Sequence, residues 1–133
     1  AFAVARSGRP GPVLIDIPKD LQNEKIEFEY PRNPVKLPGN NIIKKPEKDK
    51  LIKAANLINN SKKPVILAGH GILLSGASQE IIQLAEIASI PVTWTLLGSG
   101  GVPASHPLNM GMMGMHGEYA VNNAIQEADL LIA

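Results

Sequence analysis

The amino-acid sequence predicts an α/β fold, in which the start of a doubly wound parallel sheet follows the last helix and strand of another domain. Downstream of residue 48, segments with helical periodicity alternate with short apolar runs rich in β-branched residues. Such alternation is typical of parallel strands that are joined by crossover helices. With 44% hydrophobic and 19% charged residues, the 133-residue chain has the composition needed to bury a core.

Residues 1–30 are expected to close the first domain. A short helix leads into a turn rich in Gly and Pro, and the run Val13–Ile17 is apolar, largely β-branched and followed by Pro18. That pattern is typical of a strand buried on both faces. The next stretch is rich in Pro and Asn and has no periodicity, so we expect a linker over residues 31–48.

Residues 49–133 carry the regular pattern. Three helices are expected from apolar stripes, namely Leu51, Ala54, Ala55 and Ile58 (with Pro46 in the first turn), then Ala77, Ile81, Leu84, Ala85 and Ala88, then Ala120, Ala124 and Ala128. Strands are expected over Pro64–Ala68, Pro91–Thr95 and Asp129–Ile132, and one long glycine-rich loop over Gly98–Gly117.

Composition excludes several classes of function. The net charge of +1 and the aromatic content of 4% argue against a nucleic-acid partner, which needs clustered basic and stacking side chains. No apolar run reaches the roughly 18–20 residues that cross a bilayer, so we expect no membrane partner. Because cysteine is absent, the sequence has no disulfide, thiolate zinc site or cysteine nucleophile. Both ends fall inside predicted elements, so we expect a part of a longer polypeptide.

The turn Gly69-His70-Gly71 follows a predicted parallel strand, where glycines let a phosphate approach the backbone. The spacing matches no complete motif. Leu74 stands where a dinucleotide fingerprint has its third glycine, and Ala77 where a P-loop has its lysine. Two interpretations stay open: contact with a nucleotide, or a plain turn between strand and helix.

The loop Gly98–Gly117 holds six of the 12 glycines, all four methionines and two of the three histidines. Long loops in compact domains are usually functional. Methionines interleaved with glycines over Met112–Gly117 suit a planar apolar ligand that lies against the backbone. The alternative is a cover over the edge of the sheet.

Isolated charged and imidazole side chains carry weaker signals. Lys19 follows the strand expected before it and suits an anionic substrate, and Arg9 suits a phosphate, although both also fit solvated surface positions. The three histidines share no metal-ligand spacing and no carboxylate cluster, so we expect no metal site. No motif for a catalytic serine is present.

Three stretches together resemble the catalytic large subunit of acetolactate synthase, a family of thiamine-diphosphate-dependent enzymes. They are AFAVARSGRPGPVLIDIPKDLQ, KKPVILAGHGILLSGASQEIIQLAE and the segment from Ile90 to Ala133, which contains GMHG. The GMHG motif is the most specific of the matches. The resemblance implies that residues 1–30 end a pyrimidine-binding domain and that residues 49–133 begin a Rossmann-like central domain that binds FAD.

The resemblance also implies an activity. Such enzymes decarboxylate pyruvate on thiamine diphosphate and add the hydroxyethyl unit to a second 2-ketoacid, which gives 2-acetolactate or 2-aceto-2-hydroxybutyrate in branched-chain amino-acid biosynthesis. A cytoplasmic homodimer or tetramer, with a small regulatory subunit, is the expected parent. Its catalytic Glu would lie upstream and its GDG motif, which holds diphosphate and Mg²⁺, downstream. We therefore expect this chain alone to be inactive, with no catalytic residue of its own.

Carried over by position, the resemblance implies a flavin site and a substrate channel. Lys19 corresponds to the channel lysine, whereas His70 and Leu97 depart from the common pattern. The FAD contacts would come from Arg9, Gly69, His70, Gly71, Thr95, Leu96, Met113, Gly114, Met115, His116 and Gly117. A sister enzyme (glyoxylate carboligase, pyruvate oxidase or a ketoacid decarboxylase) and a non-catalytic nucleotide-binding module are the alternatives.

Overall fold

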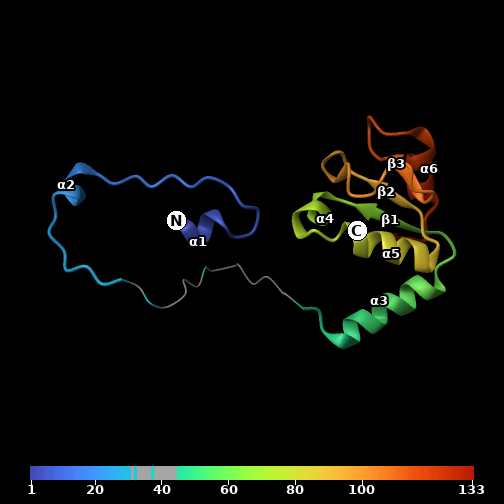
Figure 1. Cartoon of the computed structure of the whole chain (residues 1–133), viewed down its shortest axis with the longest axis horizontal. Helices are drawn as coiled ribbons and strands as arrows, with labels where there is room; N and C mark the ends of the chain where they lie inside the picture. Colours follow the sequence, from blue (N-terminus) through green and yellow to red (C-terminus); the bar gives the residue numbers. More distant parts are fainter. Residues whose placement is uncertain (31, 33–36, 38–44) are drawn as a thin grey trace. The chain divides into compact units, whose positions relative to one another are not determined.

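A computed structural model describes residues 1–30, 32, 37 and 45–133. The chain divides into two compact units, Ala1–Pro46 and Glu47–Ala133, each of which is described by itself (Figure 1). Most of the linker expected over residues 31–48 lies outside the described residues. The division into domains expected from the sequence therefore stays a prediction.

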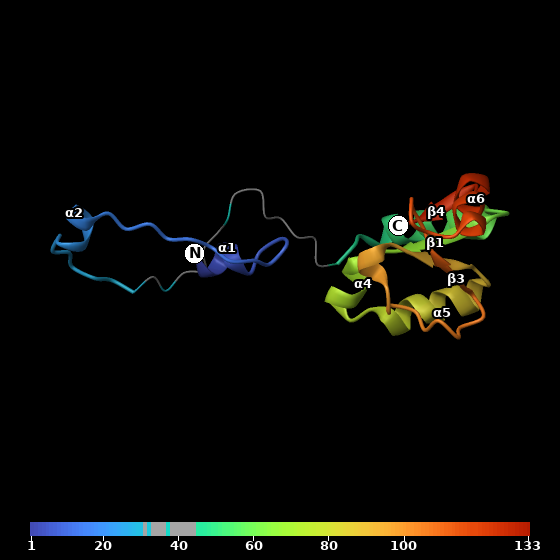
Figure 2. The ribbon, with the colours of Figure 1, turned by 90° about the horizontal axis from the view of Figure 1, so that it is seen from above.

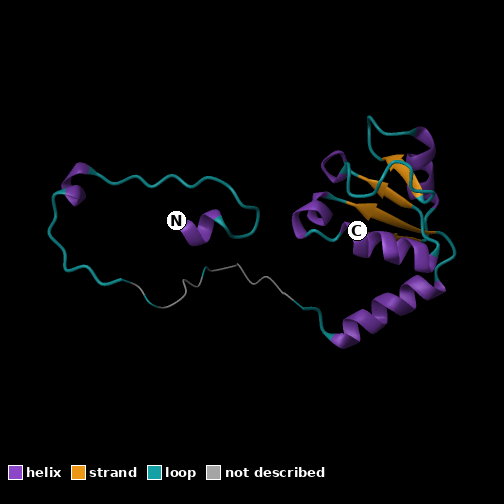
Figure 3. Cartoon of the chain, in the orientation of Figure 1, coloured by secondary structure: helices purple, strands orange, loops and turns teal. Residues whose placement is uncertain are grey.

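In the described part of the first unit, the chain forms two short helices, α1 (Phe2–Ala5) and α2 (Lys19–Gln22). The helix expected at the start is confirmed. The strand expected over Val13–Ile17 is wrong for this structure, because the segment is a loop with exposed side chains (Figure 3). A parallel strand needs a hydrogen-bonded neighbour, and no described segment of the chain pairs with these residues.

The second unit is built on a parallel sheet. Its described strands are β1 (Pro64–Ala68), β2 (Val92–Trp94), β3 (Asn109–Met112) and β4 (Leu130–Ile132), in the order β3-β2-β1-β4. Ile66 of β1 lies opposite Val92 on one side and Ile132 on the other. The chain therefore leaves β1 in one direction and returns on its other side, which confirms the predicted doubly wound α/β class.

Helices cover both faces of this sheet. The helical elements are α3 (Lys48–Asn60), α4 (His70–Ser75), α5 (Ser78–Ala88), the 3₁₀ turn η1 (Leu96–Gly98) and α6 (Tyr119–Glu127). Figures 1 and 2 show α4 and α5 on one face and α6 on the other. Right-handed crossovers that run in opposite directions along a sheet produce this arrangement. Pro46 lies just before the first residues of α3 rather than inside its first turn.

The core lies between the sheet and α5. Its buried members are Ile66, Ala68, Ala85, Ile90, Val92 and Val102, and Ile58 of α3 packs against them. On the other face, Val121 is the buried residue of α6. The small-residue face expected at Ala120, Ala124 and Ala128 is therefore wrong at Ala120, which is exposed. The buried position of α6 is Val121, one residue later than expected.

The prediction of one continuous loop over Gly98–Gly117 is also wrong, because β3 forms inside it. The sequence of β3, Asn-Met-Gly-Met, contains none of the β-branched or aromatic residues that favour strands. Pairing with β2 creates this strand, and the register between the two shifts next to Thr93. A partner strand thus overrides the low strand propensity of the segment.

Candidate functional site

Three of the predicted site segments follow three neighbouring strands. The turn Gly69–Gly71 follows β1, Thr95 and Leu96 follow β2, and the bend Met113–Gly117 follows β3. Because the strands are parallel, these segments lie at one edge of the sheet, where open α/β sheets bind ligands. The structure therefore places the site residues that the sequence predicts in the second unit along one edge of the sheet, with the segment after β2 between the other two.

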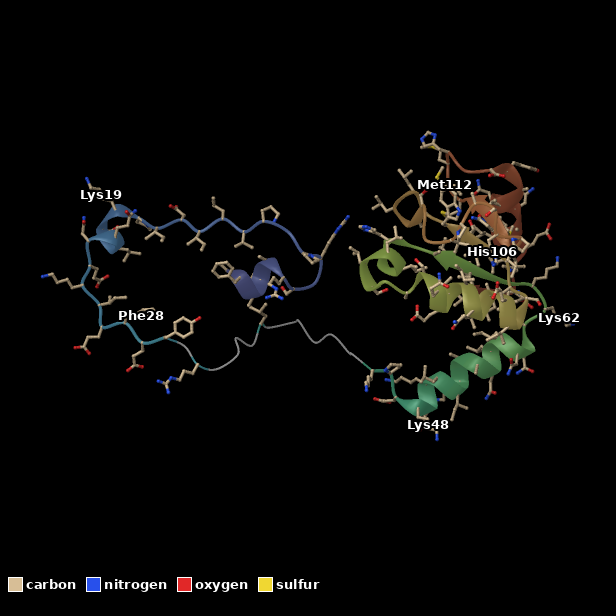
Figure 4. All side chains as sticks on the ribbon, viewed as in Figure 1. Lys19, Phe28, Lys48, Lys62, His106 and Met112 are labelled. Atoms are coloured by element: carbon tan, nitrogen blue, oxygen red, sulfur yellow. The ribbon has the colours of Figure 1, made fainter. Side chains whose placement is uncertain are left out.

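Two predicted site residues, Lys19 and Arg9, lie in the first unit. Figure 4 shows Lys19 on α2; it also labels Met112, the last residue of β3 in the second unit, after which the bend begins. Arg9 lies in the turn that follows α1. Both charged side chains are exposed, and their part in a site with the second unit stays a prediction.

In the turn after β1, the space that side chains on Gly69 and Gly71 would occupy is empty of described protein atoms. Gly69 precedes α4 with an extended backbone, and Gly71 lies in the first turn of that helix. A Cβ atom built on either glycine meets no atom of the described residues within 4 Å. Neither glycine has a positive φ. The chain's own geometry therefore requires glycine at neither position.

The turn after β2 is packed tightly instead. The Thr95 N–H donates to the carbonyl of Ala68 (3.0 Å), and the Thr95 hydroxyl accepts from the N–H of Gly98 (3.2 Å). A Cβ on Gly98 would collide with the Ala68 carbonyl, so glycine is required there. Thr95 thus joins the ends of β1 and β2, while Leu96 is 72% exposed at the same edge.

The bend after β3 is organised around Gly114, whose φ of +105° favours glycine. The carbonyl of Gly114 accepts from the Gly117 N–H (3.0 Å), and Met113 donates to the carbonyl of Trp94 (3.0 Å). Met115 is 91% exposed, and His116 is also exposed. The bend therefore presents apolar and imidazole groups outward on a hydrogen-bonded backbone.

Sequence reasoning missed two asparagines that hold this region together. The side-chain oxygen of Asn109 accepts from the Trp94 indole (3.1 Å) and from the Gly111 N–H (2.8 Å), and its amide donates to the carbonyl of Pro103 (3.0 Å). Asn122 bonds both backbone groups of Gly114. The only signal in the sequence was an asparagine near each glycine-rich stretch, which is too common to stand out.

A cavity of 370 Å³ lies beside the turn after β1. It is lined by Ile66, Leu67, Gly69, Gly71, Ile72, Ser75, Ala77, Ile81, Ile132 and Ala133. It therefore lies at the point where the strand order reverses, between β1 and β4. The bend Met113–Gly117 does not line it. A single groove shared by the turn and the bend stays a prediction, since β2 lies between the strands that carry them.

The histidines are separated in the structure. His70 begins α4, His116 lies in the bend, and His106 has its Nε2 3.2 Å from Glu86 and accepts from the Leu108 N–H at Nδ1 (3.2 Å). Among the described residues, no group of three His, Cys, Asp or Glu side chains is placed to hold a metal ion. In the same part of the chain, no helix has the length and apolarity to cross a membrane.

Comparison with known proteins identifies the family. Residues 51–133 match the family described as thiamine pyrophosphate enzyme, central domain. The chain therefore belongs to the thiamine pyrophosphate enzymes through this domain, as the sequence motifs predict.

Particular relatives match over the whole chain. It is 50% identical to a probable acetolactate synthase large subunit of Methanocaldococcus jannaschii, of which it covers 23%. It is 45% identical to the acetolactate synthase large subunit of Corynebacterium glutamicum (21% covered) and 43% identical to the chloroplastic acetolactate synthase 2 of Nicotiana tabacum (20% covered). The chain thus spans about a fifth of the length of these curated relatives.

Proposed function

We propose that this chain is the flavin-contacting part of an acetolactate synthase. The whole enzyme would decarboxylate pyruvate on thiamine diphosphate and condense the hydroxyethyl unit with a second 2-ketoacid. The similarity that covers all of the chain, at 43–50% identity to proteins named acetolactate synthase, is the observation that carries the proposal. Mg²⁺, an oligomeric parent, a small regulatory subunit and a cytoplasmic location belong to the same proposal.

The glycines of the turn after β1 support a flavin nucleotide. Gly69 and Gly71 leave open space where a Cβ would stand, and no described neighbour or backbone angle demands their lack of a side chain. Close approach of a ligand to the backbone is a physical reason for glycine at such positions. The residues present therefore fit a phosphate-bearing cofactor that passes this turn.

Exposed apolar side chains at the same edge support a planar ring. Leu96 and Leu97 are 72% and 55% exposed, and Met115 is 91% exposed. Such side chains would exclude water from a bound ring system, and methionine adapts its shape to one. Thiamine diphosphate, when bound, supplies the carbanion chemistry, and this chain's residues bind and orient the flavin.

A titration with FAD tests the proposal, and Gly71→Ala is its sharpest variant. We expect the wild-type chain to quench flavin fluorescence on binding, and Gly71→Ala to weaken the affinity about tenfold, the effect of about 1.4 kcal/mol. The melting temperature should not fall, because alanine favours a helix over glycine by up to about 1 kcal/mol.

Leu74→Ala is the matched control, because Leu74 lies on the same helix, is 65% exposed and does not line the cavity. It should bind FAD like the wild type. Equal affinities for the wild type and Gly71→Ala would show that no ligand approaches this turn.

The activity of the isolated chain is a separate prediction. Its sequence contains no GDG motif, which the resemblance assigns to diphosphate and Mg²⁺ binding. We therefore expect no acetolactate when the chain is incubated with pyruvate, thiamine diphosphate, Mg²⁺ and FAD. A colorimetric acetolactate assay checks this, and product formation above a boiled control would contradict it.

A further inference from the structure

We propose that Asn122 is the positioning residue of the bend Met113–Gly117. It lies on α6, yet its side chain reaches back to the middle of the bend. The anchor follows from the contacts alone, whereas the identity of the ligand that the bend would face rests on the proposed function.

The anchor is a pair of hydrogen bonds to one residue. The Gly114 N–H donates to Oδ1 of Asn122 (2.9 Å), and Nδ2 of Asn122 donates to the Gly114 carbonyl (2.8 Å). Because a donor meets an acceptor at both ends, the orientation of the side-chain amide is defined. The reversed amide would place two N–H groups against each other and two oxygens against each other.

Polar contacts, rather than apolar packing, hold the bend. Met115 is almost fully exposed, and a Cβ on Gly114 would meet no described atom within 4 Å. The described backbone bonds at the bend are those of Met113 with Trp94 and of Gly117 with Gly114, together with the bond from the Glu118 N–H to the Met112 carbonyl (3.0 Å), which joins its two ends. Because Gly114 has no Cβ, its backbone has more conformational freedom than that of other residues, and here it adopts a positive φ. The amide of Asn122 restrains that freedom at the centre of the bend.

The neighbours of Asn122 provide controls that separate positioning from stability. Val121 is buried under α6 (1% exposed), so Val121→Ala weakens the packing of the helix without touching the bend. Asn123 is exposed on the same helix, and Asn123→Ala removes the same chemical group at a position where the structure shows no side-chain bond to the bend.

The experiment measures amide hydrogen exchange by NMR in the 133-residue chain, together with FAD affinity. Asn122→Ala should raise the exchange rates of the Gly114 and Gly117 amides, and weaken FAD binding, by about tenfold, the size expected for losing hydrogen bonds of this kind. Asn122→Asp should be intermediate, because it keeps the acceptor for Gly114 N–H but loses the donor to the carbonyl. Asn123→Ala and Val121→Ala should leave the bend at wild-type values.

Unchanged exchange at Gly114 in Asn122→Ala would overturn the anchor. A second result would also overturn it. If Val121→Ala and Asn122→Ala lowered the melting temperature equally and also raised the exchange rates in the bend equally, the order of the bend would depend on the stability of α6 and not on the Asn122 side chain. If the bend loosens but FAD affinity does not change, the bend plays no part in flavin binding. If the wild-type chain binds no FAD while Asn122→Ala still loosens the bend, the anchor stands and the proposed function fails.

Discussion

At the scale of single residues, Asp129 joins the beginnings of two strands. Its carboxylate accepts from the backbone N–H groups of Lys62 (2.7 Å) and Lys63 (2.9 Å), just before β1. Its own N–H donates to the Lys63 carbonyl (3.3 Å). These contacts set β4 beside β1 in the register that pairs Pro64 with Leu130. The donated N–H groups, first that of Lys62, lower the pKa of Asp129 from its ordinary value of 3.8.

This pKa predicts a dependence of stability on acid. Because the folded-state pKa of Asp129 lies below the unfolded value, the stabilisation is complete above about pH 4 and is lost as the pH falls through the folded pKa. Asp129→Asn should therefore lower the melting temperature at pH 6 and flatten the loss of stability below pH 4. Thermal unfolding followed by circular dichroism from pH 6 down to pH 2 measures both, and superimposable curves for the two proteins would refute the role.

The glycines divide into two groups that respond oppositely to alanine. A side chain at Gly98 would collide with the carbonyl of Ala68, so Gly98→Ala should destabilise the fold by about 1–3 kcal/mol. Gly71→Ala should not destabilise it, since the space is open. Urea unfolding of the two variants gives the comparison. A Gly98→Ala protein as stable as the wild type would show that the turn after β2 relaxes easily.

At the scale of elements, β4 forms an edge of the sheet. In the part of the chain that the structure describes, β4 pairs with β1 on one side, and Leu131 is 43% exposed. An exposed apolar edge strand presents backbone groups that can pair with another copy of the chain.

We therefore expect the chain to self-associate through β4, and Leu131→Lys to reduce this, because an edge lysine opposes strand addition. Sedimentation velocity over a range of concentrations measures the effect. Ile87→Lys is the matched control. Ile87 is 85% exposed on α5, so this substitution introduces the same charge away from the edge strand. A wild-type chain that stays monomeric, or equal effects of both substitutions, would count against association through this strand.

The contrast between β1 and β3 shows what sequence patterns can predict at this scale. The run Pro64–Ala68 was predicted with the bounds that β1 has, because its β-branched, continuously apolar residues suit a strand with neighbours on both sides. Asn109–Met112 has no such pattern, and β3 forms because its backbone can hydrogen-bond to the neighbouring strand β2. The segment Val13–Ile17 is the reverse case. It has the sequence pattern of a strand, but no described segment of the chain pairs with it.

At the scale of the whole molecule, the two units differ in how much they bury. None of the described residues of Ala1–Pro46 is buried, whereas Glu47–Ala133 holds the core cluster. Proteolysis follows local opening, which is easiest where few apolar contacts must be broken. Limited chymotrypsin digestion should therefore cut after Leu21 and Phe28, which are 55% and 75% exposed, before it cuts after Trp94 in β2, as mass spectrometry of the products would show. Cleavage after Trp94 as early as after Phe28 would contradict this order.

Local pattern and resemblance were enough to predict the family, the α/β class, β1, and the cores of α3 and α5, because periodicity and motifs are properties of neighbouring residues. The strand order, the cavity at its reversal, the anchor of Gly114 by Asn122 and the division of the glycines came from three-dimensional contacts. Each of these depends on groups that meet across strands or between a helix and a loop. Tertiary contacts of this kind produce no periodic pattern in the sequence, so they are defined only when the helices and strands pack together.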